Sequence, residues 1–234
     1  MKNIAVICAM QEELDSLIKV LNIDNKKEIK CLNSKIYFSS YLGTNIIMGL
    51  CGIGKVNAAI FTQHIIDKYN IDHIFNVGVA GTLNDKVILG DVVVATDLVY
   101  HDFDVREFNY ELGQVPRIDI FSFSTDLDVL NKTKSFNDLN FKIYYGRVVT
   151  GDQFIADIEK AIFIRDYFGS LACEMEATAI AHTAYLNNIK FTIIKGLSDM
   201  AGLDNKAVVS FEKFLETASI NSSIVIKNIL DCFF

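Results

Sequence analysis

The sequence contains no tryptophan, a single proline at position 116, and no Cys-x-x-Cys pair among its five cysteines. So little proline, with 13 glycines and 51% apolar residues in a chain of 234, leaves no basis for a long disordered segment. Scattered cysteines in odd number indicate neither a disulfide framework nor a zinc ribbon, and they fit a reducing cytoplasm. We therefore expect one compact cytoplasmic domain over residues 1–234.

Basic clusters and long hydrophobic runs are also missing. The 22 Lys and Arg residues against 29 Asp and Glu residues give a formal charge of −7, which would repel a phosphate backbone. The apolar start at 4–10 is too short for the core of a signal peptide. No stretch approaches the roughly 20 apolar residues that span a bilayer. We expect neither a nucleic-acid partner nor a membrane partner.

Strand patterns alternate with helical patterns along most of the chain. The continuous apolar run at 4–9 predicts a strand that is covered on both faces, and 11–21 carries apolar residues at helical spacing. Further strands are expected at 35–40, 45–50, 73–78, 87–96, 141–150 and 191–195, and further helices at 56–69, 127–136, 158–168, 177–186 and 210–230. This order predicts an α/β fold with a mixed central sheet and helices on both faces.

Ligands in such sheets bind at the carboxyl ends of strands, and four candidate turns lie there, at 9–13, 51–55, 77–82 and 195–199. The glycines at 52–54 lack P-loop spacing because Val56 stands where the metal-binding hydroxyl would be. Neither glycine turn matches Gly-x-Gly-x-x-Gly, so a polyphosphate site is not expected. Both turns are compatible with a tight bend or with close approach to a ligand.

Several acids stand near these turns. Glu12 and Glu13 open a predicted helix, where they interact favourably with its dipole, and Glu13 is also a candidate catalytic residue by its position. Glu174 and Glu176 are two residues apart, so in an extended segment they point to opposite faces and cannot form a close pair. One of them should face a cavity, and the pattern does not say which. Asp199 is either a site acid or the N-cap of the next helix.

Metal-ligating patterns are not found, because the histidines are dispersed at positions 64, 73, 101 and 182. We expect no metal and no cofactor. The segment 100–116 is rich in aromatic residues for a predicted loop. Such a loop either folds back onto its own core or covers the surface of a partner.

Five stretches taken together carry a resemblance to a known family. They are 9–13 (AMQEE), 52–59 (GIGKVNAA), 151–155 (GDQFI), 174–181 (EMEATAIA) and 198–199 (SD). In this order the chain resembles the bacterial 5′-methylthioadenosine/S-adenosylhomocysteine nucleosidases. The resemblance implies the nucleoside phosphorylase fold, a homodimer, a place in methionine salvage, and hydrolysis of the N-glycosidic bond of these two nucleosides and of 5′-deoxyadenosine.

The same resemblance implies roles for the acids. Glu13 matches the base that activates water, and Asp199 matches the acid that protonates the leaving adenine. Glu176 matches the carboxylate that holds the ribose hydroxyls together with the backbone of Met175. These roles suit a transition state with oxocarbenium character, which needs a carboxylate, a positioned water and a protonated leaving group. Desolvation by apolar neighbours should raise the pKa of Asp199.

Further positions correspond to the substrate-binding set of the family. Phe154 matches the ring that stacks on adenine, and Ile155 matches the residue whose backbone contacts the adenine edge. Two positions depart from the family: Val79 replaces a serine near the ribose, and Lys195 replaces an arginine near the attacking water. We expect these changes to affect the rate and the preference among nucleosides, including 6-amino-6-deoxyfutalosine. The rest of the implied pocket consists of Met10, Ile53, Ser198 and Phe211.

The resemblance also gives the aromatic loop a partner. In the family the matching segment reaches across the dimer and covers the 5′-alkylthio group of the substrate bound to the other protomer. The corresponding positions are Val105, Phe108, Tyr110 and Pro116. The expected partner is therefore a second copy of this chain.

Two other functions are alternatives to hydrolysis. A nucleoside phosphorylase needs cations that hold phosphate beside the ribose, whereas all four arginines lie outside the turns at 9–13, 51–55 and 77–82. Glu13 would in addition repel phosphate. A nucleoside-binding protein without activity would have no need of both a base and an acid.

Overall fold

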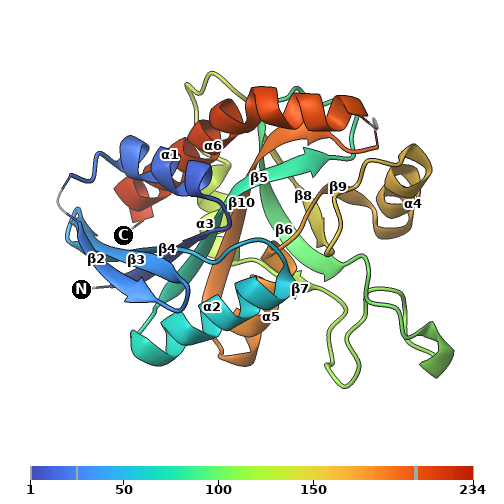
Figure 1. Cartoon of the computed structure of the whole chain (residues 1–234), viewed down its shortest axis with the longest axis horizontal. Helices are drawn as coiled ribbons and strands as arrows, with labels where there is room; N and C mark the ends of the chain where they lie inside the picture. The colour runs from blue at the N-terminus through green and yellow to red at the C-terminus, as the bar shows by residue number, and fades with distance from the viewer. Residues whose placement is uncertain (1, 25, 203–204, 234) are drawn as a thin grey trace.

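A mixed β-sheet runs through the molecule, and helices cover both of its faces (Figure 1). The computed structural model describes residues 2–24, 26–202 and 205–233. Its strands are β1 (Asn3–Cys8), β2 (Lys27–Cys31), β3 (Ser34–Tyr41), β4 (Thr44–Leu50), β5 (His73–Thr82), β6 (Val92–Tyr100), β7 (Phe123–Ser124), β8 (Ile143–Thr150), β9 (Ser170–Glu174) and β10 (Lys190–Met200). Its helices are α1 (Gln11–Leu21), α2 (Lys55–Lys68), η1 (Arg106–Phe108), α3 (Leu127–Thr133), α4 (Ile158–Phe168), α5 (Ala177–Leu186) and α6 (Asn205–Phe233). The expected fold class is confirmed.

Part of the sheet closes on itself. Because β10 pairs with both β5 and β6, a ring runs through β5, β10, β6, β8 and β9. From β5 the sheet continues through β1 and β4 to β3 and β2. Strands β5 and β9 overlap near their ends through the antiparallel pairs Gly81↔Cys173 and Thr82↔Ala172. The carboxyl ends of strands that run in opposite directions therefore meet at one place.

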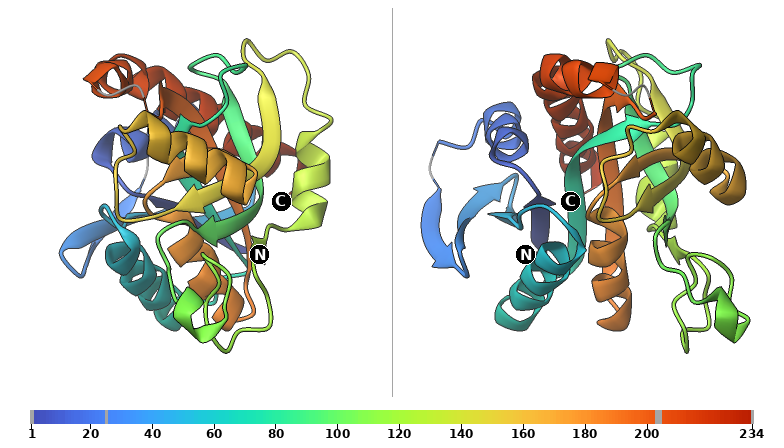
Figure 2. Two further views of the ribbon diagram at one scale, coloured as in Figure 1. Left: turned by 90° about the vertical axis from the view of Figure 1, so that its right-hand side faces the viewer. Right: turned by 45° about the vertical axis from the view of Figure 1, so that its right-hand side comes forward.

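Helices α1 and α6 pack on one face of the sheet, and α2 and α5 pack on the other (Figures 1 and 2). Strand β1 illustrates why both faces need cover. Ile4 and Val6 belong to the apolar cluster beneath α1 and α6, whereas Ala5 and Ile7 belong to the cluster beneath α2 and α5. Successive side chains of a strand point to opposite faces, so an all-apolar strand is stable only between two layers.

Helix α1 places the first acid of the site. Its apolar residues Leu14 and Leu17 are buried, and the Glu13 carboxylate accepts the backbone N–H of Met10 at 3.0 Å, which satisfies a donor that has no partner within the helix. Asn22, with φ of 52°, ends the helix in the left-handed conformation. The helices expected at 11–21, 158–168 and 177–186 are confirmed residue for residue.

Two of the four expected turns are wrong. Residues 77–82 lie in β5 and residues 195–199 lie in β10, because both strands continue past their apolar runs. The glycines in them permit close packing rather than a bend. A Cβ atom on Gly196 would stand 2.1 Å from the backbone oxygen of Ala218 in α6. The helix thus packs directly on the strand at this point.

Other differences have local causes. The strand expected at 87–96 begins at Val92, since Gly90 adopts a φ of 95° and 87–91 form a turn. Strand β2 was missed because it lies at the edge of the sheet and four of its five residues are exposed. Strand β9 was missed because it is only five residues long. Within the described ranges, no helix is both long and apolar enough to span a bilayer.

Candidate active site

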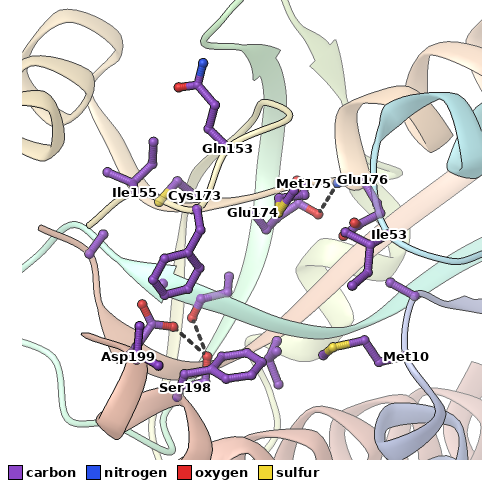
Figure 3. A pocket seen from close by; sticks show the side chains of 18 of the residues that line it. Met10, Ile53, Gln153, Ile155, Cys173, Glu174, Met175, Glu176, Ser198 and Asp199 are labelled. Atoms are coloured by element: carbon purple, nitrogen blue, oxygen red, sulfur yellow. Dashed lines mark hydrogen bonds between the residues drawn. The ribbon is translucent and has the colours of Figure 1, made fainter. Parts of the chain in front are cut away.

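A pocket of about 310 Å³ opens where the ends of β1, β5, β9 and β10 converge with the 151–155 loop and the start of α6 (Figure 3). Most of the predicted site residues line it. These are Met10, Glu13, Ile53, Val79, Phe154, Ile155, Met175, Glu176, Ser198, Asp199 and Phe211. Residues that are far apart in the sequence therefore share one cavity.

Glu13 is held rigidly at the floor of this pocket. Its Oε2 accepts the backbone N–H groups of Ala9 at 2.8 Å and Met10 at 3.0 Å, and its Oε1 accepts the N–H of Val79 at 3.0 Å. A Cβ atom on Gly78 would stand 2.3 Å from Oε1, so this glycine makes room for the carboxylate. Burial raises the pKa of Glu13, while the charge of Lys195 and the three amides oppose the rise.

Glu176 faces the glycine turn at 52–54. Its Oε1 accepts the backbone N–H of Gly54 at 2.7 Å, and the residue is only 5% exposed. Gly54 adopts a φ of 96°, which other residues seldom reach. Burial and the charge of Glu174 raise the pKa of Glu176, whereas the charge of Lys195 lowers it. The glycine turn therefore approaches the acid with its backbone, and Ile53 beside it contributes a wall of the pocket.

Asp199 lies on the other side of the pocket from Met10 and Ile53 (Figure 3). It is a residue of β10 paired with Gly81 of β5, so the alternative that it caps a helix is wrong. Its Oδ1 accepts the hydroxyl of Ser198 at 2.8 Å. Burial raises the pKa of Asp199 to about 6, against the opposing effect of this hydrogen bond. The group can therefore carry a proton close to neutral pH.

Two aromatic rings line the same pocket. The rings of Phe154 and Phe211 meet edge to face, with centroids 6.3 Å apart. Phe154 is half-exposed, whereas Ile155 next to it is buried and its carbonyl accepts the N–H of Gly202 at 2.9 Å. This end of the pocket is apolar and suits a flat aromatic ligand.

Lys195 lies behind the pocket wall and is only 1% exposed. Its Nζ forms an ion pair with Oε2 of Glu174 at 3.1 Å. Burial lowers the pKa of Lys195, but the carboxylates of Glu174, Glu13 and Glu176 more than offset this effect, and the net shift is upward. Glu174 and Glu176 are both buried, so the sequence pattern could not decide between them.

Lys55, which follows the glycine turn, binds carboxylates of its own chain. Its Nζ lies 2.6 Å from Oδ2 of Asp102, and its backbone N–H donates to Asp152 at 2.9 Å. Asp152 in turn donates its N–H to Asp102 at 2.9 Å. These contacts fasten the turn to the loops after β6 and β8.

The segment 101–122 projects away from the sheet and its helices (Figures 1 and 2). None of its four predicted site residues lines the pocket of its own chain. Phe108 at its tip is 75% exposed, whereas Leu112 is buried and packs against the core. The segment thus packs Leu112 on its own core and leaves Phe108 uncovered.

Sequence reasoning missed other lining residues. Ala9, Ala80, Gly81 and Ala201 are small residues at strand ends, which give no signal of their own in the sequence. Gln153, Cys173 and Val208 also line the pocket, and Glu174 lines it together with Glu176, whereas only one of these two acids was expected to face a cavity. Among the described residues, no three His, Cys, Asp or Glu side chains gather in a way that could hold a metal ion.

The family model of the phosphorylase superfamily matches residues 3–231 of the chain. The 5′-methylthioadenosine/S-adenosylhomocysteine nucleosidase of Staphylococcus haemolyticus is 37% identical over 229 residues, which cover 97% of this chain and 98% of that protein. The chain belongs to the phosphorylase superfamily, in the family of these nucleosidases.

Solved structures agree. The nucleosidase of Neisseria meningitidis in complex with methylthio-immucillin-A matches with a TM-score of 0.90 and 35% identity, over 98% of this chain and 99% of that one. The nucleosidase of Colwellia psychrerythraea in complex with adenine matches with a TM-score of 0.90 and 32% identity, over 98% and 95% of the two chains. The family and the fold expected from the sequence motifs are both confirmed.

Proposed function

We propose that this enzyme hydrolyses the N-glycosidic bond of 5′-methylthioadenosine and S-adenosylhomocysteine, and also that of 5′-deoxyadenosine, releasing adenine and the 5-substituted ribose. One observation carries the proposal. Three carboxyl side chains, Glu13, Glu176 and Asp199, come from separate parts of the chain and line one pocket, each with a different set of partners. Such a set can serve one reaction with a base, a sugar-binding group and an acid.

Glu13 is the proposed base. An ionised carboxylate offers about four lone-pair sites, and three amide donors occupy three of those on Glu13. The remaining site belongs to Oε1, which receives a single amide. A water molecule that donates to this site has its oxygen held for attack on the anomeric carbon, and Oε1 takes the proton that the water loses.

Asp199 is the proposed acid. Ser198 binds its Oδ1, which leaves Oδ2 free to hold the proton and to donate it to the leaving adenine. A Cβ atom on Gly81 would stand 2.8 Å from Oδ2, so the glycine keeps space open beside that oxygen. Protonation makes adenine a weaker base and a better leaving group, which lowers the barrier to cleavage of the bond.

Glu176 is the proposed ribose ligand. Gly54 binds its Oε1, and its second oxygen remains available to accept hydrogen bonds from sugar hydroxyls. Met175 and Val79 line the same pocket and would contact the sugar. Phe154, Ile155 and Phe211 would hold the purine, since aromatic and apolar groups suit its flat face.

A homodimer completes the proposed site. The exposed tip of segment 101–122 would cover the 5′ substituent in the partner's pocket, through Val105, Phe108, Tyr110 and Pro116. The 75% exposure of Phe108 supports this placement, because a large apolar side chain at a loop tip gains from cover by a partner. We further propose that the enzyme acts in the cytoplasm, in methionine salvage, on small adenine nucleosides alone.

The test is adenine release from 5′-methylthioadenosine, S-adenosylhomocysteine, 5′-deoxyadenosine and 6-amino-6-deoxyfutalosine, compared by kcat/KM with and without inorganic phosphate. We expect each of the first three substrates to give adenine and free 5-substituted ribose, at a rate that does not depend on inorganic phosphate. A sugar 1-phosphate formed only with phosphate would identify a phosphorylase. Tight nucleoside binding without adenine release would identify a binding protein.

A further inference from the structure

Glu174 is a fourth buried acid at the pocket, and none of the steps proposed above uses it. Its side chain is 4% exposed. Figure 3 shows its carboxylate directed at the backbone nitrogen of Glu176, and Oε2 accepts this N–H at 3.0 Å and that of Ala177 at 2.8 Å. Its Oε1 receives the hydroxyl of Thr150, and Nζ of Lys195 completes the set.

The Glu174 carboxylate is the acceptor in each of these hydrogen bonds. The hydroxyl of Thr150 already accepts the N–H of Thr178 at 2.8 Å, so its one proton is directed at Glu174. Two backbone amides supply the other donors, and the ammonium of Lys195 adds an ion pair. The carboxylate of Glu174 is therefore held by three hydrogen bonds and one ion pair, all from its own chain.

Lys195 is the basic partner of Glu174 in this ion pair. Its charge also acts on Glu13 and Glu176, the proposed base and ribose ligand. A buried ammonium next to several carboxylates binds the one that offers the best geometry. Glu174 is the carboxylate with which Lys195 forms its ion pair in this structure.

We propose that Glu174 is a positioning residue, which holds Lys195 away from direct pairing with Glu13 and so preserves the capacity of Glu13 to take a proton from water. This inference rests on the proposed function. Glu174 also fixes the backbone from which Glu176 projects, because it binds the N–H groups of residues 176 and 177. One side chain thereby controls the position of a charge and the start of a helix.

The test must account for each ionisable group around the pair. The groups whose pKa the charge of Glu174 or Lys195 shifts are Cys8 from β1, Glu13 from α1, Cys51 after β4, Tyr100 at the end of β6, His101 after it, Cys173 from β9 and Glu176 before α5. Glu13 is the group assigned to the base, so the acidic limb of the kcat/KM profile against pH reports on it.

The two members of the pair should move this limb in opposite directions. Glu174→Gln keeps the shape of the side chain but removes the charge that holds the Lys195 ammonium, which can then pair with Glu13. The acidic limb of the kcat/KM profile should therefore move to lower pH by about one unit. With a weaker base, kcat should fall by roughly tenfold or more, and KM should change less. Lys195→Met removes the ammonium, so the limb should move to higher pH. Lys195→Arg keeps the charge and should leave the limb near its original position.

The double variant and a matched control separate charge from structure. Glu174→Gln combined with Lys195→Met removes both charges, so its limb should return toward that of the wild type. Thr150→Val removes a hydrogen bond to Glu174 but no charge. It should lower Tm and leave the acidic limb in place.

Carbon-13 NMR of labelled glutamate side chains follows the ionisation of Glu13 in the same proteins without turnover. If the wild type releases no adenine, the proposed function fails, and the NMR titrations still decide the role of Glu174. Shifts of opposite sign in Glu174→Gln and Lys195→Met support the proposal. The proposal is overturned if the pKa of Glu13 stays unchanged in both variants or shifts in the same direction in both. If Glu174→Gln does not fold, Lys195→Met decides alone: a pKa of Glu13 that is unchanged or lowered in this variant overturns the proposal.

Discussion

The pocket wall and the segment 101–122 present their functional groups in different ways. In the wall, Glu13 is 2% exposed and Asp199 3% exposed, and backbone amides or a neighbouring hydroxyl hold each carboxylate. In the segment, which projects away from the sheet (Figure 2), Phe108 is 75% exposed. The groups assigned to bond cleavage thus have their partners within one chain, whereas those assigned to the 5′ substituent do not. Changes in the wall should therefore affect kcat, and changes in the segment should affect KM.

The largest effect is expected for Asp199→Asn in the wall. An amide has the shape of the carboxyl but no proton to give to adenine, so kcat should fall by roughly 100- to 10,000-fold with KM little changed. Adenine release from 5′-methylthioadenosine measures this. Ser198→Ala, which removes only the hydrogen bond to Oδ1, should lose far less. Near-normal turnover in Asp199→Asn would refute the assignment of the acid.

A smaller loss of kcat is expected for Gly78→Ala, which tests how closely catalysis depends on the position of the Glu13 carboxylate. The added Cβ would stand 2.3 Å from Oε1 of Glu13 and must displace that carboxylate. Because catalysis depends on placement within fractions of an ångström, kcat should fall by about 10- to 100-fold. Gly43→Ala is the control, since its Cβ meets no atom within 4 Å although its φ is 83°. It should lower Tm and leave kcat unchanged.

In the segment, Phe108→Ser should raise KM by about five- to tenfold for substrates with a 5′-alkylthio group and change kcat little, because only contact area is lost. Leu42→Ser alters an equally exposed apolar residue of the turn between β3 and β4 and should change neither constant. Sedimentation of both variants reports the oligomeric state. A monomer with wild-type KM would show that the segment does not cover a partner's pocket.

The smallest effect concerns stability. Burial raises the pKa of Asp199 from an ordinary 3.8 to about 6, so the folded protein binds this proton more tightly than the unfolded chain does. Ionisation of Asp199 therefore lowers the free energy of unfolding. The loss is negligible below about pH 4 and reaches about 2–3 kcal/mol above pH 6. Asp199→Asn removes this cost.

At pH 7.5 the Tm of Asp199→Asn should exceed that of the wild type by several degrees, and the two values should converge at pH 4. Calorimetry at both pH values measures the difference. Asn in place of Asp85, an exposed residue outside the pocket, is the matched surface control. A lower Tm for Asp199→Asn at pH 7.5 would mean that the carboxylate of Asp199 stabilises the fold.

Much of the fold was predictable because its signals are local. The apolar spacing within 11–21, 158–168 and 177–186 fixed helix bounds that the structure reproduces. Strands β5 and β10 were predicted too short, because their later residues include glycines and polar groups whose partners lie on other elements. Gly196 looks like part of a turn in the sequence, and only the approach of α6 explains it as a packing contact.

The site followed the same division. The motifs identified Glu13, Glu176 and Asp199 as residues of one family pattern, and they line one pocket. Their spacing could not reveal that Glu174 binds Lys195, since these two residues stand 21 positions apart, on strands β9 and β10, which belong to the same ring but do not pair with each other. The sequence also could not predict that Lys195 lies behind the pocket wall and does not line the pocket.

Residue types and their order along the chain thus determined the family, the alternation of strands and helices, and which acids were expected to share a pocket, because these depend on short patterns. Only the tertiary structure decided which backbone amides hold each acid, how far burial raises the pKa of Asp199, and which carboxylate pairs with the buried lysine. Hydrogen bonds and charge interactions depend on distances of a few ångströms, and the folded chain alone sets those distances between residues that are remote in sequence.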